Sequence, residues 1–308
     1  MSERLLLPGI GLVAAIVAVV SLIAPWGEDD RGTYHGAQEV GGTMFGALIG
    51  VAALIGALIA LRGITEGDDV VSGGRLRRSH LLMAAGGAVL GPALAFALSP
   101  EVTYTSWKAS GLGGWLAAAM GLVMLLSGYG WARRQPMAPT AGISSEIDRS
   151  FGIGLLAAGV LAVLVPFFGW LKLAVDDDTD FIYGALQDGL RGVGLVVFPA
   201  AVLMLVAGAL IVYRYNRPSP STTGGIGAEH LGLVASATGL STALAFLLSI
   251  IRNDLDEAVD PVVGLYLYLV AALIGLYVTA SALLFPGQLS HDEAAEGDPE
   301  EAPQPVDA

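Results

Sequence analysis

The chain has 308 residues, of which 54% are hydrophobic and only 14% charged, and its formal net charge is −13. Soluble domains usually carry about 25% charged residues, so this composition argues against an ordinary soluble globular protein. The acidic balance, with no basic stripe, argues against nucleic-acid binding. The absence of Cys excludes disulfides, thiolate metal sites and cysteine nucleophiles.

Eight apolar runs are long enough to cross a membrane, because a helix needs about 20 residues to span about 30 Å of hydrocarbon. The sequence therefore predicts an all-α integral membrane protein of about eight transmembrane helices, built as two tandem four-helix repeats in parallel orientation. The first run is too long for the apolar core of a signal peptide, so we expect it to be retained. The expected spans are Leu5–Trp26, Gly42–Leu61, Leu81–Leu98, Gly111–Trp131, Gly152–Val175, Val193–Tyr213, Leu231–Ile251 and Val262–Phe285.

The spans divide the chain into four segments. Residues 1–134 are expected to form the first four-helix half and residues 152–285 the second, with a cytoplasmic linker at 135–151. Residues 286–308 are rich in Asp and Glu and contain no Lys or Arg. Such a segment cannot bury enough apolar surface to fold, which predicts a disordered cytoplasmic tail.

The prediction of a repeat comes from short matches that occur in the same order in both halves. Each half contains an even number of spans, so both halves should enter the membrane from the same side, as in a parallel repeat. The matched pairs are Gly9–Ala15 with Gly152–Ala158, Asp29-Asp30 with Asp177-Asp178, His80 with His230, and Ala93–Ser99 with Ala243–Ser249.

Charge asymmetry predicts the orientation. With the N-terminus inside the cell, the inner segments hold about twice as many Arg and Lys residues as the outer loops, as the positive-inside rule requires. Both termini are therefore expected on the cytoplasmic side of the cell membrane. The acidic, lysine-poor composition is typical of proteins from a halophilic archaeon, where high salt screens the self-repulsion of such a charge. The acidic outer loops are either the ordinary exterior of such a protein or a site for divalent cations.

Small residues at Gly42, Gly46 and Gly50 form a stripe on one face of the second expected span. Such stripes let helices approach closely. The stripe indicates either a seam between two copies of the chain or ordinary packing within one copy.

The matched histidines His80 and His230 both fall at the cytoplasmic mouth of the third span of a half. They are therefore expected near the pseudo-twofold axis, where they could face each other. Interfacial packing and a functional role both remain open for this pair.

The middle of every expected span lacks Asp, Glu, Lys, Arg and His. Ionisable groups at depth mark proton relays, ion paths and coupled-transport sites, and no catalytic, metal-binding or cofactor-binding motif is present. The sequence therefore predicts a protein that is not an enzyme, an accessory or scaffold subunit whose partners are the lipid bilayer and either other membrane proteins or further copies of itself. The alternative is a permease for a small uncharged or apolar substrate.

Overall fold

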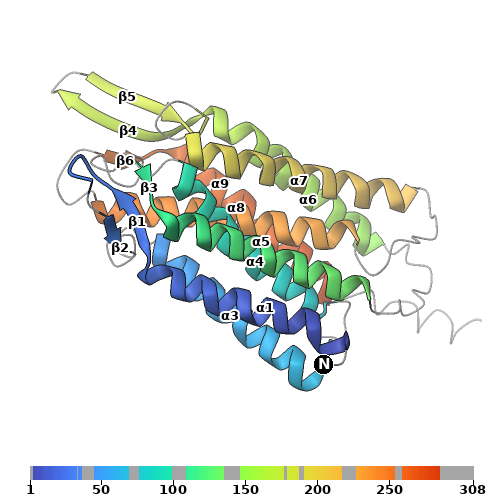
Figure 1. Ribbon diagram of the computed structural model, residues 1–308. Helices are drawn as coiled ribbons and strands as arrows, with labels where there is room; N and C mark the ends of the chain where they lie inside the picture. The colour runs from blue at the N-terminus through green and yellow to red at the C-terminus, as the bar shows by residue number, and fades with distance from the viewer. Residues whose placement is uncertain are drawn as a thin grey trace, which may run out of the picture.

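The computed structural model describes ten stretches of the chain: residues 3–32, 34–36, 45–68, 76–98, 109–134, 146–176, 179–186, 191–216, 227–253 and 259–284. Within them, eight helices are long and apolar enough to cross a membrane, as the sequence predicts. They lie side by side in one elongated bundle (Figure 1). These helices are α1 (Glu3–Val20), α3 (Phe45–Glu66), α4 (Arg78–Leu98), α5 (Leu112–Arg133), α6 (Glu146–Leu164), α7 (Arg191–Asn216), α8 (Ala228–Asn253) and α9 (Val263–Leu284).

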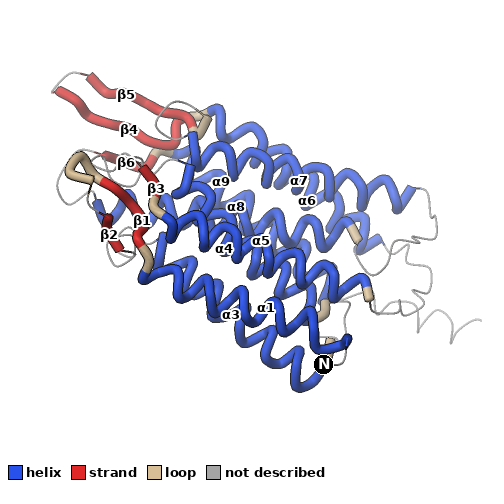
Figure 2. Tube along the Cα trace, in the orientation of Figure 1, coloured by secondary structure: helices blue, strands red, loops and turns tan. Residues whose placement is uncertain are grey.

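Two small antiparallel sheets lie at one end of the bundle (Figure 2), here called the sheet end. The all-α prediction did not include these strands: it expected loops at most of them and helix at the start of β1 and over most of β4. The first sheet has the strand order β2-β1-β3 and the second β5-β4-β6. Their strands are β1 (Pro25–Glu28), β2 (Tyr34–Gly36), β3 (Ala109–Ser110), β4 (Gly169–Asp176), β5 (Thr179–Gly184) and β6 (Val259–Pro261).

The first and fifth expected spans run into these strands and end earlier than predicted. A short 3₁₀ turn follows each helix, η1 (Ser21–Ile23) after α1 and η4 (Val165–Phe167) after α6. The Trp26 Nε1–H donates to the Ser21 carbonyl at 2.8 Å, and the Trp170 Nε1–H donates to the Val165 carbonyl at 3.1 Å. These indoles satisfy carbonyls freed at the helix end. An apolar run alone does not distinguish a buried strand from a helix, which is why the boundary was misplaced.

At the other boundaries, helices extend a few residues past the apolar runs because charged residues can occupy their exposed ends. α6 begins at Glu146, inside the segment expected to be linker. The first three residues of the predicted second span, 42–44, lie outside the described residues.

The described elements follow the same order before residue 134 and after residue 145: helix, 3₁₀ turn, two strands, two helices, one strand and a final helix. Matching hydrogen bonds accompany this order. The Gly111 N–H donates to the Trp26 carbonyl at 2.7 Å, and the Val262 N–H donates to the Trp170 carbonyl at 3.0 Å. In each set the bond ties the strand before the last helix to the first strand of the sheet.

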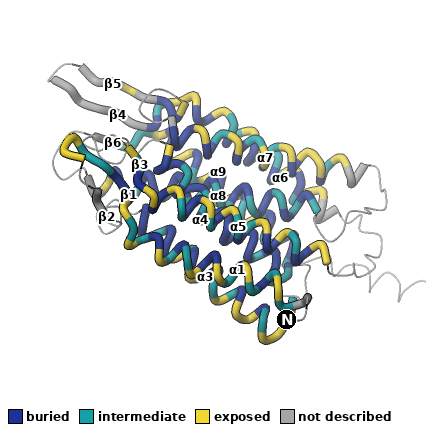
Figure 3. The backbone as a smooth tube through the Cα atoms, viewed as in Figure 1, coloured by how far each residue is buried: buried dark blue, intermediate teal, exposed yellow. Residues whose placement is uncertain are grey.

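The most buried helices are α4 and α8, which contact each other along the centre of the bundle (Figures 1 and 3). Of the residues in the apolar stretch of α4, 67% are buried, and in that of α8 56% are buried. The corresponding shares are 28% for α3 and 33% for α1. A β-carbon added at Gly87 would lie 2.5 Å from Thr238 Oγ1, and one at Gly91 would collide with Thr242 Oγ1. Two small residues on α4 therefore permit the close approach of α8.

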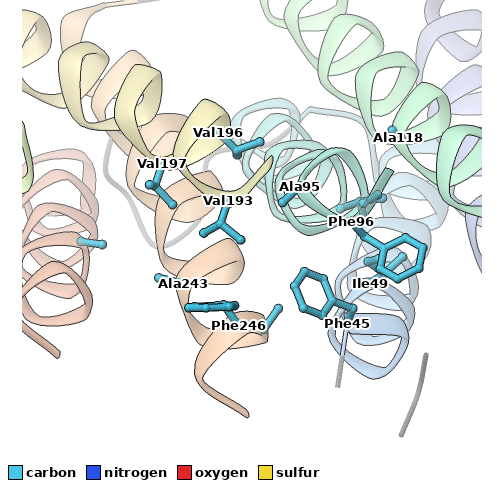
Figure 4. Close-up of a cluster of buried hydrophobic side chains, with 14 of the residues drawn as sticks. Phe45, Ile49, Ala95, Phe96, Ala118, Val193, Val196, Val197, Ala243 and Phe246 are labelled. Atoms are coloured by element: carbon cyan, nitrogen blue, oxygen red, sulfur yellow. The ribbon is translucent and has the colours of Figure 1, made fainter. Parts of the chain in front are cut away.

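One apolar core continues across this central contact. Phe45 of α3 and Phe246 of α8 point toward each other in Figure 4, and Phe96 of α4 lies beside them. Phe96 also packs on Trp26 at 5.3 Å between ring centroids, while Phe246 packs on Trp170 at 6.5 Å. The core therefore joins the two sets of four helices near the sheet end.

Candidate functional site at the histidine end

The end of the bundle opposite the sheets, here called the histidine end, contains His80 and His230. Each histidine is the third residue of its helix, because α4 begins at Arg78 and α8 at Ala228. His80 Nδ1 accepts the Arg77 backbone N–H at 3.2 Å, and His230 Nδ1 accepts the Gly227 backbone N–H at 2.8 Å. A side chain that reaches back from this position to the N-cap N–H is one arm of a capping box, usually supplied by Glu or Gln.

This hydrogen bonding determines the tautomer of both rings. A nitrogen that accepts a hydrogen bond carries no proton, so the neutral imidazole holds its proton on Nε2. The two rings lie 3.8 Å apart between centroids, with their planes tilted by 51°. His80 is 2% exposed and His230 6%, so the pair is shielded from solvent. The contact therefore joins α4 to α8 through two neutral rings.

A carboxylate caps the start of α4 from the preceding loop. Asp68 accepts both the Ser79 backbone N–H and the Ser79 hydroxyl, each at 2.8 Å. Burial raises the pKa of Asp68 above its ordinary value, and this effect exceeds the opposing effects of the two Ser79 hydrogen bonds and of the Arg77 and Arg78 charges. Counted from the histidines, Glu229 is the residue of α8 that corresponds to Ser79. Both helix starts therefore have a carboxylate nearby, as the positive end of a helix favours.

Arg78 holds the same loop to α4. Its guanidinium donates to the Gly67 carbonyl at 2.8 Å and forms an ion pair with Glu66. The sequence did not single out Asp68 or Glu66. The available signal was the pattern of a polar N-terminal turn directly before a long apolar run, which is typical of a capped helix start.

An apolar cluster lies at the histidine end. Leu76, Leu233 and Leu283 form a buried cluster, and the Leu76 N–H donates to the Leu283 carbonyl at 3.1 Å. The last turn of α9 therefore covers the start of α4 beside the histidine pair.

The glycine stripe lies partly within the described residues. Gly42 lies outside them, while Gly46 and Gly50 are buried in α3. A β-carbon at Gly50 would lie 3.1 Å from Leu22 Cδ1, in the turn after α1. The described part of the stripe thus packs within the chain, and the lipid-exposed side of α3 is lined instead by Val51, Leu54, Ile55, Leu58 and Leu61.

Three hydroxyls deep in α8 bond to carbonyls of their own helix. Thr238 donates to the Val234 carbonyl, and Ser241 and Thr242 both donate to the Thr238 carbonyl. Such bonds are the usual arrangement for hydroxyls inside a helix. Among the residues described, Asp, Glu, Lys, Arg and His lie near helix ends or in the strands and loops between helices, and no cluster of three or more His, Asp and Glu side chains could hold a metal ion.

The histidine end therefore offers two neutral imidazoles, flanked by carboxylates, that could exchange protons, and no described metal-ligand set. Comparison with protein families, with curated proteins and with solved structures finds no match to the chain.

Proposed function

We propose that this chain is a non-enzymatic subunit of the cell membrane that acts as a scaffold or accessory to other membrane proteins. The observation that carries the proposal is the closed centre of the bundle, where α4 and α8 touch along their length and share one apolar core. A centre filled by side chains leaves the perimeter of the bundle as the surface for partners.

The chemistry available in the described part of the chain favours the same proposal. Hydrolysis or redox chemistry within a membrane needs acid–base groups or metal ligands. The described charged side chains lie near helix ends or in the strands and loops between helices, and Thr238 and Thr242 of α8 bond to carbonyls of their own helix. An apolar perimeter with small polar ends suits binding better than catalysis.

The alternative, a permease for a small uncharged substrate, needs a path between the halves. The contacts of Gly87 with Thr238 and of Gly91 with Thr242 occupy the place where a central path would run. The alternative therefore requires α4 and α8 to separate, which the scaffold proposal does not.

We also propose that the two sets of four helices are tandem repeats in parallel orientation. The shared element order, the paired indole hydrogen bonds and the two histidine caps support this proposal. Contacts between α4 and α8 advance in the same direction along both helices, from His80 with His230 to Gly91 with Thr242, as a parallel repeat requires.

The distribution of exposed charge supports an orientation with the histidine end, and hence both termini, in the cytoplasm. At the histidine end four arginines, Arg62, Arg133, Arg134 and Arg149, are exposed beside one acidic residue, Glu66, whereas at the sheet end exposed Asp30 lies next to exposed Arg31. Reporter fusions after Arg134 and after Asp30 test this orientation: the first should read cytoplasmic and the second external. The opposite pattern would reverse the proposed topology.

The scaffold function is tested by purification of the tagged full chain from native membranes in a mild detergent, followed by native mass measurement. We expect a stoichiometric complex with another membrane protein or with further copies of the chain. Recovery as a lone monomer after in-membrane crosslinking would contradict the proposal. The permease alternative is tested in parallel by the rate at which proteoliposomes swell in glycerol or urea, which should equal that of protein-free vesicles.

A further inference from the structure

The histidine pair cannot take up a proton without losing hydrogen bonds. In a protonated imidazole both ring nitrogens are donors, so Nδ1 of His80 could no longer accept the Arg77 N–H, and Nδ1 of His230 could no longer accept the Gly227 N–H. Protonation would therefore remove the cap from the helix concerned, and the freed N–H would have to find another partner at a buried helix start.

Electrostatic interactions also oppose protonation of the two rings. Both rings lie in the first turn of a helix, where the helix dipole opposes a positive charge. Two protonated rings would also repel each other, because their centroids are only 3.8 Å apart and both rings are buried. Separation of the helix starts would relieve both effects.

The charged groups around the pair do not remove this conflict. Arg77 and Arg78 begin the same turn as His80 and add positive charge, and Arg78 is already paired with Glu66. Asp68 is engaged by Ser79. Glu229 precedes His230 in α8, and a carboxylate there favours a charged ring but cannot replace the Gly227 N–H bond that protonation removes. From α9, the side chains that pack here are those of Leu283 and Leu284, which carry no charge.

We propose that His80 and His230 form a proton-sensitive junction between α4 and α8: the junction is closed when both rings are neutral, and proton uptake by either ring loosens the two helix starts. Histidine is the side chain whose charge ordinarily changes between about pH 5 and 8, so acidification at the histidine end is the signal that this junction would report. The proposal concerns regulation and does not depend on the scaffold function.

Glutamine at the same two positions provides the test. Gln at the third helical residue also accepts the N-cap N–H, but it does not titrate. Purified wild-type protein should lose about 5 °C or more of its melting temperature between about pH 7.5 and 5.5, whereas the double variant His80→Gln, His230→Gln should lose much less. The matched control is His35→Gln, His291→Gln, which replaces the other two histidines of the chain and should behave as the wild type does.

Equal pH dependence in the wild type and the double Gln variant would overturn the proposal, and so would loss of the pH dependence in the control variant. If the double variant does not fold, hydrogen exchange of the wild type gives the answer. After correction for intrinsic rates, backbone amides at the starts of α4 and α8 should lose protection below about pH 6, while the middle of α5 keeps its protection. Unchanged protection at both helix starts would exclude the junction.

Discussion

The two sets of four helices have the same order of described elements but place their closest helix crossing in different pairs. In the first set the closest crossing is between α4 and α5: a β-carbon at Gly86 would lie 2.5 Å from Leu125 N, and one at Gly121 would lie 2.6 Å from Leu90 N. In the second set the closest crossing is between α6 and α7, where a β-carbon at Gly159 would lie 2.5 Å from Leu205 N.

The α8–α9 pair, which corresponds to α4–α5, is held apart by side chains. Ser236 corresponds to Gly86, because each lies six residues after the histidine of its helix. Ala272 corresponds to Gly121, because each lies eight residues after a glycine that contacts an indole, Gly264 with Trp170 and Gly113 with Trp26. Between α8 and α9, a β-carbon at Gly239 would meet the Tyr268 hydroxyl rather than backbone. The same order of helices therefore accommodates different packing when the glycines lie in different helix pairs, because the smallest residues at a crossing set the distance between the helices.

Substitution at the α4–α5 crossing should have the largest effect. Gly86→Ala and Gly121→Ala each place a methyl group against backbone atoms, which cannot move aside as a side chain can, and each should cost about 2–3 kcal/mol. The measurement is thermal unfolding of the purified protein. The control is Gly130→Ala on α5, where the added carbon meets only Leu7 side-chain atoms at 3.5 Å; a control as unstable as Gly121→Ala would show that the cost is not one of crossing distance.

At the α6–α7 crossing we expect a smaller loss, about 1–2 kcal/mol for Gly159→Ala or Gly208→Ala. Backbone atoms of Leu205 and Leu156 lie equally close, but α6 and α7 are each only 39% buried in their apolar windows and can shift outward. The same unfolding assay ranks the two crossings. A larger loss here than at Gly86 would mean that the second set, and not α4, dominates stability. Gly154→Ala on α6 is the control, since its nearest neighbour is a Val278 methyl group at 3.4 Å.

The loop carboxylate at the start of α4 should contribute about 1 kcal/mol as a cap. Asp68→Ala should therefore lower the melting temperature, whereas Asp68→Asn keeps an acceptor for the Ser79 N–H and should be close to neutral. Because the pKa of Asp68 is raised above its ordinary value of 3.8, its contribution is fully present below that value and declines as pH rises through the folded pKa. The stability of the wild type relative to Asp68→Asn should thus fall as pH increases from about 4, and a rise would contradict the assignment.

The smallest effect is expected at Tyr268, which has no counterpart in the first set because Ala117 takes its place. Its hydroxyl donates to the Val197 carbonyl at 2.8 Å, joining α9 to α7. Tyr268→Phe removes this bond and keeps the ring packed on Trp170 at 5.2 Å. The loss should be about 0.5–1.5 kcal/mol in unfolding experiments. Tyr266→Phe, at an exposed position of the same helix, should have no effect, and equal losses at both positions would assign the effect to something other than this bond.

The helices could be predicted from sequence because long apolar runs have a single structural solution in a membrane. The strands could not be predicted. Gly169–Asp176 continues the apolar run of α6 and has the composition of a helix, and only the structure shows that α6 ends before it, where the Trp170 indole bonds to the Val165 carbonyl. Sequence matching identified His80 and His230 as corresponding positions. The role of Nδ1 as a cap could not be predicted, because the helices begin at Arg78 and Ala228, earlier than the predicted spans. The Asp68 cap could not be predicted from the sequence because it depends on the conformation of the loop before α4.

The Leu76–Leu283 hydrogen bond links the start of α4 to the last turn of α9, and this has a consequence for biosynthesis. At about 5–20 residues per second, the ribosome adds Leu283 roughly 10–40 s after Leu76. For most of that interval α4, the helix with the largest buried share, lacks α8, and the Leu76 N–H lacks its acceptor until α9 is complete. A nascent chain that stops before its final helix therefore leaves an open backbone N–H at Leu76. It also leaves Gly232 and Gly239 of α8 without the α9 side chains that contact them. By these features cellular quality control can distinguish an unfinished molecule from a finished one.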